Sequence, residues 1–121
     1  MVHIVKAYTK TPVGAHYGLG DWLLQRLTAV VMALYTLGLA ACLLWHAPAA
    51  YADWKAIFSG TFARVTTMLF FTALLYHAWI GMRDIFMDYL KATSLRLALE
   101  TAVVIVLVLY LIWAASILWG R

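Results

Sequence analysis

The sequence is short of charge. Only 12% of its 121 residues are charged, whereas 66% are hydrophobic. Soluble domains carry about 25% charged residues, and a chain this short buries too small a fraction of its surface to hide so much apolar area from water. A soluble globular protein is therefore excluded, lipid is the expected solvent, and the length allows one domain.

Cysteine is almost absent, and the basic residues are scattered. The single cysteine, Cys42, excludes a disulfide framework and a cysteine-based zinc or iron–sulfur site, so we expect it to pack in an apolar span. The net charge is +4, but the basic residues form no run. We therefore interpret them as residues that flank membrane spans rather than as a nucleic-acid-binding surface. Residues 1–20 lack the basic start and apolar core of a signal peptide, and we interpret them as an extramembrane arm.

Three long segments contain no Asp, Glu, Lys or Arg: residues 27–52, 65–82 and 101–120. A membrane-spanning helix needs ~20 predominantly apolar residues, with a range of ~17–25. The sequence therefore predicts an all-α membrane protein with three transmembrane helices, the first ending before Pro48. The expected spans are residues 22–45, 61–89 and 95–119, within an anchor domain of residues 21–121. Residues 46–60 and 90–94 are the expected loops, and Ser94 is the expected cap of the third span.

The distribution of Lys and Arg predicts the orientation. The arm and the second loop side carry six of these residues, and the first loop side and the tail carry three. The positive-inside rule then places the N terminus in the cytoplasm and the C terminus on the periplasmic side. Three helices form a thin bundle, and lipid provides little hydrophobic drive between helices. We therefore expect helices from another chain to complete the bundle.

His77 lies deep in the second expected span. An ionisable residue at this depth is costly and points to a functional site, although a neutral histidine bonded to a neighbouring helix explains it equally well. The spacing of His77, Gly81, Asp84 and Asp88 places the four residues on one helix face. Gly81 leaves room for a bulky group beside His77, either a haem ring or a closely packed helix.

Asp88 and Tyr89 end the same helix. They follow His77 by about twelve residues, or ~18 Å along the axis, which places them near the cytoplasmic interface. A phenol there can donate a hydrogen bond to a quinone carbonyl, and a neighbouring carboxylate can orient it or relay a proton. Taken alone, the pair is better explained as an interfacial Tyr anchor and a solvated Asp.

Basic residues flank the spans on the same side. Arg26 is expected to pair with Asp21 or with an anionic group such as a haem propionate, or else to extend toward the interface as a flank residue. Arg83 and Lys91 are interpreted as flank charges.

The second span resembles a known membrane-protein signature. Its sequence contains His77-x3-Gly81-x6-Asp88-Tyr89, which is similar to the motif of the succinate dehydrogenase hydrophobic membrane anchor subunit, the D-type anchor of complex II. Supporting segments are Arg26-Leu-Thr-Ala-Val and Leu95-Arg-Leu. The resemblance covers about residues 20–121 and leaves the arm without an assigned role.

The resemblance implies half of a two-chain haem-binding anchor bundle in the bacterial inner membrane. The implied partners are a flavoprotein that oxidises succinate, an iron–sulfur subunit and a second, cytochrome b556-type anchor. His77 becomes an axial ligand of the haem b iron, with the other ligand on the partner anchor. Tyr89 becomes the ubiquinone hydrogen-bond donor with Asp88 beside it, and Arg26 lies near the haem propionates or the quinone.

By this resemblance the chain does not itself act on succinate, but it contributes to the quinone site of succinate dehydrogenase in the tricarboxylic acid cycle and aerobic respiration. Two alternatives remain at this point. One is the anchor of a fumarate reductase, which has the same architecture and uses menaquinol. The other is a structural membrane protein without a redox role, in which His77 only packs.

Overall fold

The computed structural model describes residues 18–120, and this part of the chain contains helices and no strand. In chain order the helices are α1 (Gly18–His46), α2 (Tyr51–Ile57), α3 (Thr61–Tyr89) and α4 (Thr93–Trp119). The three long helices α1, α3 and α4 are each long and apolar enough to cross a membrane. The prediction of an all-α protein with three spans is confirmed.

The helix boundaries differ from the expected ones at α1 and α4. α3 has the predicted bounds, but α1 begins at Gly18, four residues before its expected start, so the last part of the expected arm is helical. The rest of that arm lies outside the described residues. α4 begins at Thr93 without a side-chain cap, so Ser94 lies inside the helix and the expected cap is wrong.

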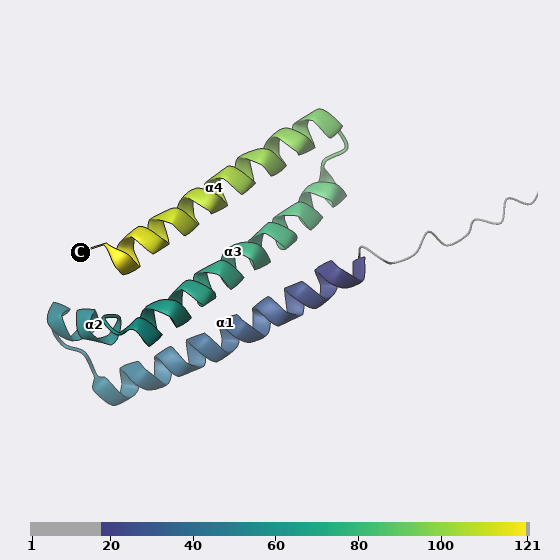
Figure 1. Cartoon of the computed structure of the whole chain (residues 1–121). Helices are drawn as coiled ribbons and strands as arrows, with labels where there is room; N and C mark the ends of the chain where they lie inside the picture. The colour runs from purple at the N-terminus through teal and green to yellow at the C-terminus, as the bar shows by residue number, and fades with distance from the viewer. Residues whose placement is uncertain (1–17, 121) are drawn as a thin grey trace, which may run out of the picture.

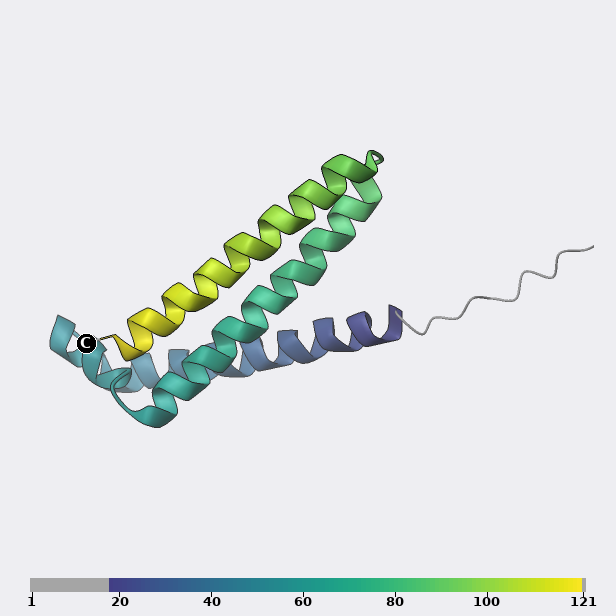
Figure 2. The ribbon, with the colours of Figure 1, turned by 45° about the horizontal axis from the view of Figure 1, so that its top comes forward.

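The helix α3 is the centre of the arrangement. Both α1 and α4 pack along it (Figure 1). A second view shows α4 running beside α3 over its whole length, whereas α1 crosses behind α3 (Figure 2). The start of α1, the end of α3 and the start of α4 therefore share one end of the molecule, and α2 lies at the other end.

The short helix α2 occupies a connection that the sequence predicted to be a loop. The Asp53 carboxylate accepts the N–H groups of Ala49 at 3.1 Å and Ala50 at 3.0 Å, just before the first turn. These bonds, led by the one from Ala50, lower the pKa of Asp53 because they favour the ionised carboxylate. Between α1 and α2, Ala47 has a φ of 40°, the left-handed conformation in which helices commonly end.

The chain buries very little of its own surface. Among residues 18–120, the buried ones are Thr28, Thr67, Ala73, Ile80 and Ala114. Large apolar side chains stay open, such as Leu34 at 66% and Leu37 at 68% exposure. Exposing so much apolar surface to water is unfavourable, so lipid or other helices must cover it. The contacts made by described residues therefore support the expectation of further helices around this chain.

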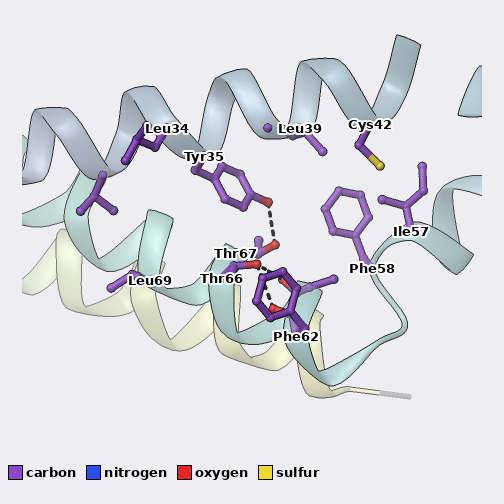
Figure 3. Close-up of a pocket in the computed structure, with 13 residues that line it drawn as sticks. Leu34, Tyr35, Leu39, Cys42, Ile57, Phe58, Phe62, Thr66, Thr67 and Leu69 are labelled. Carbon is purple, nitrogen blue, oxygen red and sulfur yellow. Dashed lines mark hydrogen bonds between the residues drawn. The ribbon is translucent and has the colours of Figure 1, made fainter. Parts of the chain in front are cut away.

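Polar and aromatic contacts join α1 to α3 in the half of the molecule nearer α2. The Tyr35 hydroxyl lies 2.6 Å from Thr67 Oγ1, and the Tyr35 ring stacks on Phe70 with centroids 4.6 Å apart. Beside this contact is an open, mostly apolar hollow of about 550 Å³, lined by α1, by the end of α2 with the residue after it, and by α3 (Figure 3). The walls of this hollow are therefore mostly apolar.

Candidate functional site

His77 is half-buried and meets two polar side chains of α1. Its Nδ1 lies 3.0 Å from Thr28 Oγ1, and its Nε2 lies 3.2 Å from the amide nitrogen of Gln25. Gln25 and Thr28 are three residues apart, so they share a face of α1 and reach the two edges of one imidazole ring. Hydrogen bonding to a neighbouring helix, one of the two readings left open by the sequence, is therefore present.

A cleft of about 710 Å³ extends from His77 to the end of the molecule where α1 begins. Its volume is in the range of small-molecule and cofactor sites. Both α1 and α3 line it, through Gly18, Asp21, Trp22, Gln25, Arg26, Ala29, Val30, His77, Ile80, Arg83, Asp84 and Met87. The cleft thus joins a histidine and apolar side chains to a charged end.

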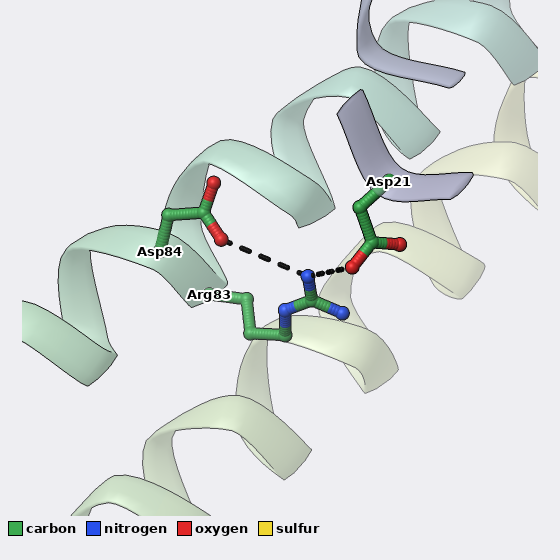
Figure 4. A network of polar contacts seen from close by, with 3 residues as sticks. All are labelled: Asp21, Arg83 and Asp84. Atoms are coloured by element: carbon green, nitrogen blue, oxygen red, sulfur yellow. Dashed lines mark hydrogen bonds and ion pairs between the residues drawn. The ribbon is translucent and has the colours of Figure 1, made fainter. Parts of the chain in front are cut away.

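The charged end is built around Arg83 (Figure 4). Its guanidinium Nη2 donates to the Asp21 carboxylate of α1, and it lies 3.7 Å from Asp84 Oδ1. In addition to its predicted place at the flank of the span, Arg83 has a side chain that is only 27% exposed and pairs across two helices. The physical reason is the early start of α1, which places Asp21 in a helical first turn beside α3. Arg83 Nε is buried without a hydrogen-bond partner among the described residues.

Arg26 lines the same cleft and remains exposed. Its guanidinium carbon lies 4.6 Å from the centroid of the Trp22 ring, a cation–π arrangement. The expected pairing of Arg26 with Asp21 is not formed, because Asp21 binds Arg83. No carboxylate of residues 18–120 forms an ion pair with Arg26, so its charge is available to an anionic group.

The predicted stripe on α3 is partly reproduced around the cleft. His77 and Asp84 both line it, whereas Gly81 and Asp88 are not among its lining residues. A Cβ built on Gly81 meets no atom within 4 Å. Close packing against another described helix therefore does not require glycine at this position, and the space beside it is open.

Asp88 and Tyr89 lie in the last turn of α3, as predicted. Both are exposed, Tyr89 by 81%. Twelve residues of helix separate Tyr89 from His77, which corresponds to ~18 Å along the axis. The cleft at His77 and the Tyr89 phenol at the end of α3 are thus two separate places, and the phenol is accessible to molecules outside the chain.

Gln25 and Thr28 were not among the residues expected at the site. Neither residue is charged, so neither interrupts a segment without Asp, Glu, Lys or Arg, the pattern that predicted the spans. An amide side chain near the start of an apolar helix was the available signal, because polar side chains facing lipid are costly.

A protein-only metal site of the usual kind is absent from the described part of the chain. Residues 18–120 contain no group of three or more His, Cys, Asp or Glu side chains arranged to hold a metal ion. His77 is therefore able to contribute one ligand at this cleft, and a metal bound there would take its other ligands from a cofactor or another chain.

Two comparisons with known proteins give consistent results. Residues 7–115 match the family described as succinate dehydrogenase/fumarate reductase transmembrane subunit. The chain is also similar to the succinate dehydrogenase hydrophobic membrane anchor subunit of Coxiella burnetii (strain RSA 493 / Nine Mile phase I), with 43% identity over 102 residues. That alignment covers 84% of this chain and 89% of the relative.

Proposed function

Because the chain belongs to the succinate dehydrogenase/fumarate reductase transmembrane subunit family, we propose that it anchors a succinate:ubiquinone oxidoreductase. In this proposal it binds haem b together with a second, cytochrome b-type anchor and contributes to the ubiquinone site. A flavoprotein and an iron–sulfur subunit complete the complex at the cytoplasmic face of the inner membrane. The 43% identical relative favours succinate dehydrogenase over fumarate reductase.

The observation that carries the haem assignment is the cleft beside His77. An axial ligand needs a nitrogen lone pair, the porphyrin ring needs apolar walls, and the propionates need cations. His77 offers the nitrogen, Val30 and Ile80 are apolar lining residues, and Arg26 provides a cation that no carboxylate of residues 18–120 pairs with. These residues fit a haem, which when bound supplies reversible one-electron chemistry.

The incomplete first coordination sphere supports a two-chain site. His77 would supply one ligand, because residues 18–120 contain no group of three or more His, Cys, Asp or Glu side chains arranged to hold a metal ion. The exposed surfaces of the long helices leave room for partner helices. A histidine of the second anchor would provide another ligand. The chain's own contribution is to orient one imidazole, to line one side of the ring and to hold charge near the propionates.

The exposed end of α3 supports the quinone assignment. The Tyr89 phenol has an O–H donor suited to a quinone carbonyl oxygen, and its 81% exposure allows a site completed by other subunits. The neighbouring Asp88 carboxylate is exposed too, and it can orient the donor or pass a proton toward the quinone. Two electrons and two protons convert the quinone to the quinol.

The haem assignment is tested on the purified four-subunit complex. We expect His77→Ala to remove b-type haem absorbance in the Soret and α bands. His46→Ala is the matched control, because His46 is exposed at the opposite end of α1 and bonds locally to the Cys42 carbonyl at 3.0 Å. An unchanged spectrum in His77→Ala would show that His77 is not a ligand.

The quinone assignment is tested by separating two activities. Tyr89→Phe is expected to lower quinone reduction about two- to twelvefold, since one hydrogen bond contributes about 0.5–1.5 kcal/mol, and to leave dye-linked succinate oxidation intact. Tyr51→Phe changes a phenol that is 80% exposed in α2 at the other end of the molecule, so it serves as the control. Equal loss of both activities in Tyr89→Phe would indicate failed assembly instead.

A further inference from the structure

In the hydrogen bond between α1 and His77, one group must donate and the other accept, and the position of His77 in the sequence does not reveal which. We propose that Thr28 is a positioning residue whose hydroxyl holds His77 in the Nδ1–H tautomer, so that Nε2 keeps the lone pair needed to bind iron. This inference rests on the proposed haem function. It adds Thr28 to a site for which the sequence had named only Arg26 on α1.

The Thr28 hydroxyl has a single proton to donate. Thr28 Oγ1 lies 2.7 Å from the carbonyl oxygen of Leu24, one turn earlier, and 3.0 Å from that of Gln25. A carbonyl oxygen only accepts, so a 2.7 Å contact between two oxygens requires the hydroxyl proton between them. Thr28 therefore donates to its own helix, as threonine commonly does in membrane helices.

The third contact of the hydroxyl then determines the histidine tautomer. His77 Nδ1 lies 3.0 Å from Thr28 Oγ1, whose proton is already engaged. The hydroxyl oxygen must accept from Nδ1–H, and a neutral imidazole has only one N–H. Nε2 therefore carries the lone pair. Thr28 is only 8% exposed, so water does not compete for this bond.

The other ring nitrogen agrees with this assignment. The Gln25 amide nitrogen, which can only donate, lies 3.2 Å from His77 Nε2. The opposite tautomer would need the Gln25 amide reversed, and it would leave Thr28 and Leu24 oxygens 2.7 Å apart without a proton. Gln25 Oε1 is buried and has no partner among the described residues. The Gln25 amide is therefore held only through its nitrogen. It can rotate away and leave His77 Nε2 free to bind a metal.

The hydrogen bond has a consequence for a bound metal. A ligand histidine that donates its other N–H to an acceptor is fixed in orientation and becomes more basic, and losing such a partner typically weakens metal binding by about 10–100-fold. A more basic imidazole favours the oxidised iron. Removing the Thr28 hydroxyl should thus weaken haem retention and shift the haem midpoint potential upward.

The test uses the whole four-subunit complex with substitutions at Thr28. Thr28→Val removes the hydroxyl and keeps the branched shape, whereas Thr28→Ser keeps the hydroxyl. Thr36→Val is the matched control, because Thr36 bonds to the Met32 carbonyl at 2.8 Å in the same way but is exposed. The measurements are haem per complex after dilution, the midpoint potential and the ferric haem electron paramagnetic resonance spectrum.

We expect Thr28→Val to retain haem about 10–100-fold less tightly, with a raised potential and altered ferric g values. Thr28→Ser should restore all three properties, and Thr36→Val should match the wild type. If the extra methyl of Val disturbs helix packing, Thr28→Ala removes the same hydroxyl with less bulk, and its potential decides the question.

Two failures are distinguishable. A wild-type complex without haem, or a haem spectrum that survives His77→Ala, would overturn the proposed function itself. A haem that depends on His77 but keeps its potential and g values in Thr28→Val and Thr28→Ala would overturn only the role of Thr28. Equal loss in the Ser variant would also overturn it, because the hydroxyl would then not be the cause.

Discussion

Replacing Asp21 and replacing Arg83 are expected to lower the stability of the protein by different amounts, although the two residues form one ion pair. Asp21→Asn leaves Arg83 beside one carboxylate, because Asp84 Oδ1 is 3.7 Å from the guanidinium. Arg83→Met instead leaves two carboxylates, Asp21 and Asp84, without the cation that lies between them (Figure 4). Arg83→Met should therefore be the more destabilising change.

The burial of the pair bounds the magnitude. Exposed ion pairs contribute about 0.2–1 kcal/mol, and breaking a buried pair costs about 3–5 kcal/mol. The Arg83 and Asp21 side chains are 27% and 35% exposed, between these limits. We expect Asp21→Asn to lower the free energy of unfolding by about 1 kcal/mol and Arg83→Met by about 2 kcal/mol, from the same ranges.

Unfolding measurements on the two single variants give this difference. Unfolding in mixed detergent and sodium dodecyl sulfate micelles, followed by a pair of distance probes on α1 and α3, gives the stability of each variant. Lys91→Met is the control, since Lys91 is exposed at the same end and forms no ion pair with residues 18–120. Equal stability of Arg83→Met and Lys91→Met would contradict this expectation, and so would a larger loss of stability in Asp21→Asn than in Arg83→Met.

Three further changes probe the scaffold. Tyr35→Phe keeps the aromatic stack but leaves the buried Thr67 hydroxyl without its 2.6 Å partner. It should cost about 0.5–2 kcal/mol in the same unfolding assay, and the added Thr67→Val should recover part of that loss. Ala47→Gly should stabilise by up to about 1 kcal/mol, because glycine adopts the φ of 40° without strain; a lower stability would contradict this. The pKa of Asp53 is depressed in the folded state, so its stabilising effect is complete above the unfolded pKa and is lost as pH falls through the folded value. A carboxyl carbon NMR titration should show that pKa below its usual range, and an unshifted value would exclude the two backbone bonds.

The helices were largely predictable from the sequence, and their ends were less so. Long runs without charge locate spans reliably, because lipid excludes charged side chains strongly. The start of α1 was missed by four residues, since Asp21 in its first turn looks like part of a polar arm. The short helix α2 was missed because seven residues carry too little periodic signal to separate helix from loop.

The functional residues were predictable in part. His77 stood out because an ionisable side chain in an apolar helix is rare, and Asp84 shares its cleft as the helical spacing predicted. The partner of Arg83 was not predictable, because Asp21 lies 62 residues away in the sequence. Nor does a sequence reveal which side chains of α1 face an imidazole on α3.

The sequence by itself determined that this protein has three spanning helices, and it pointed to His77 and to the Asp88–Tyr89 end of α3 as candidate sites. These conclusions depend on local composition and on the helical repeat, which neighbouring residues specify. The tertiary structure decided that Thr28 and Gln25 contact the His77 ring, and that Arg83 pairs with Asp21 rather than serving as a free flank charge. These facts depend on how α1 lies against α3, which no single helix encodes.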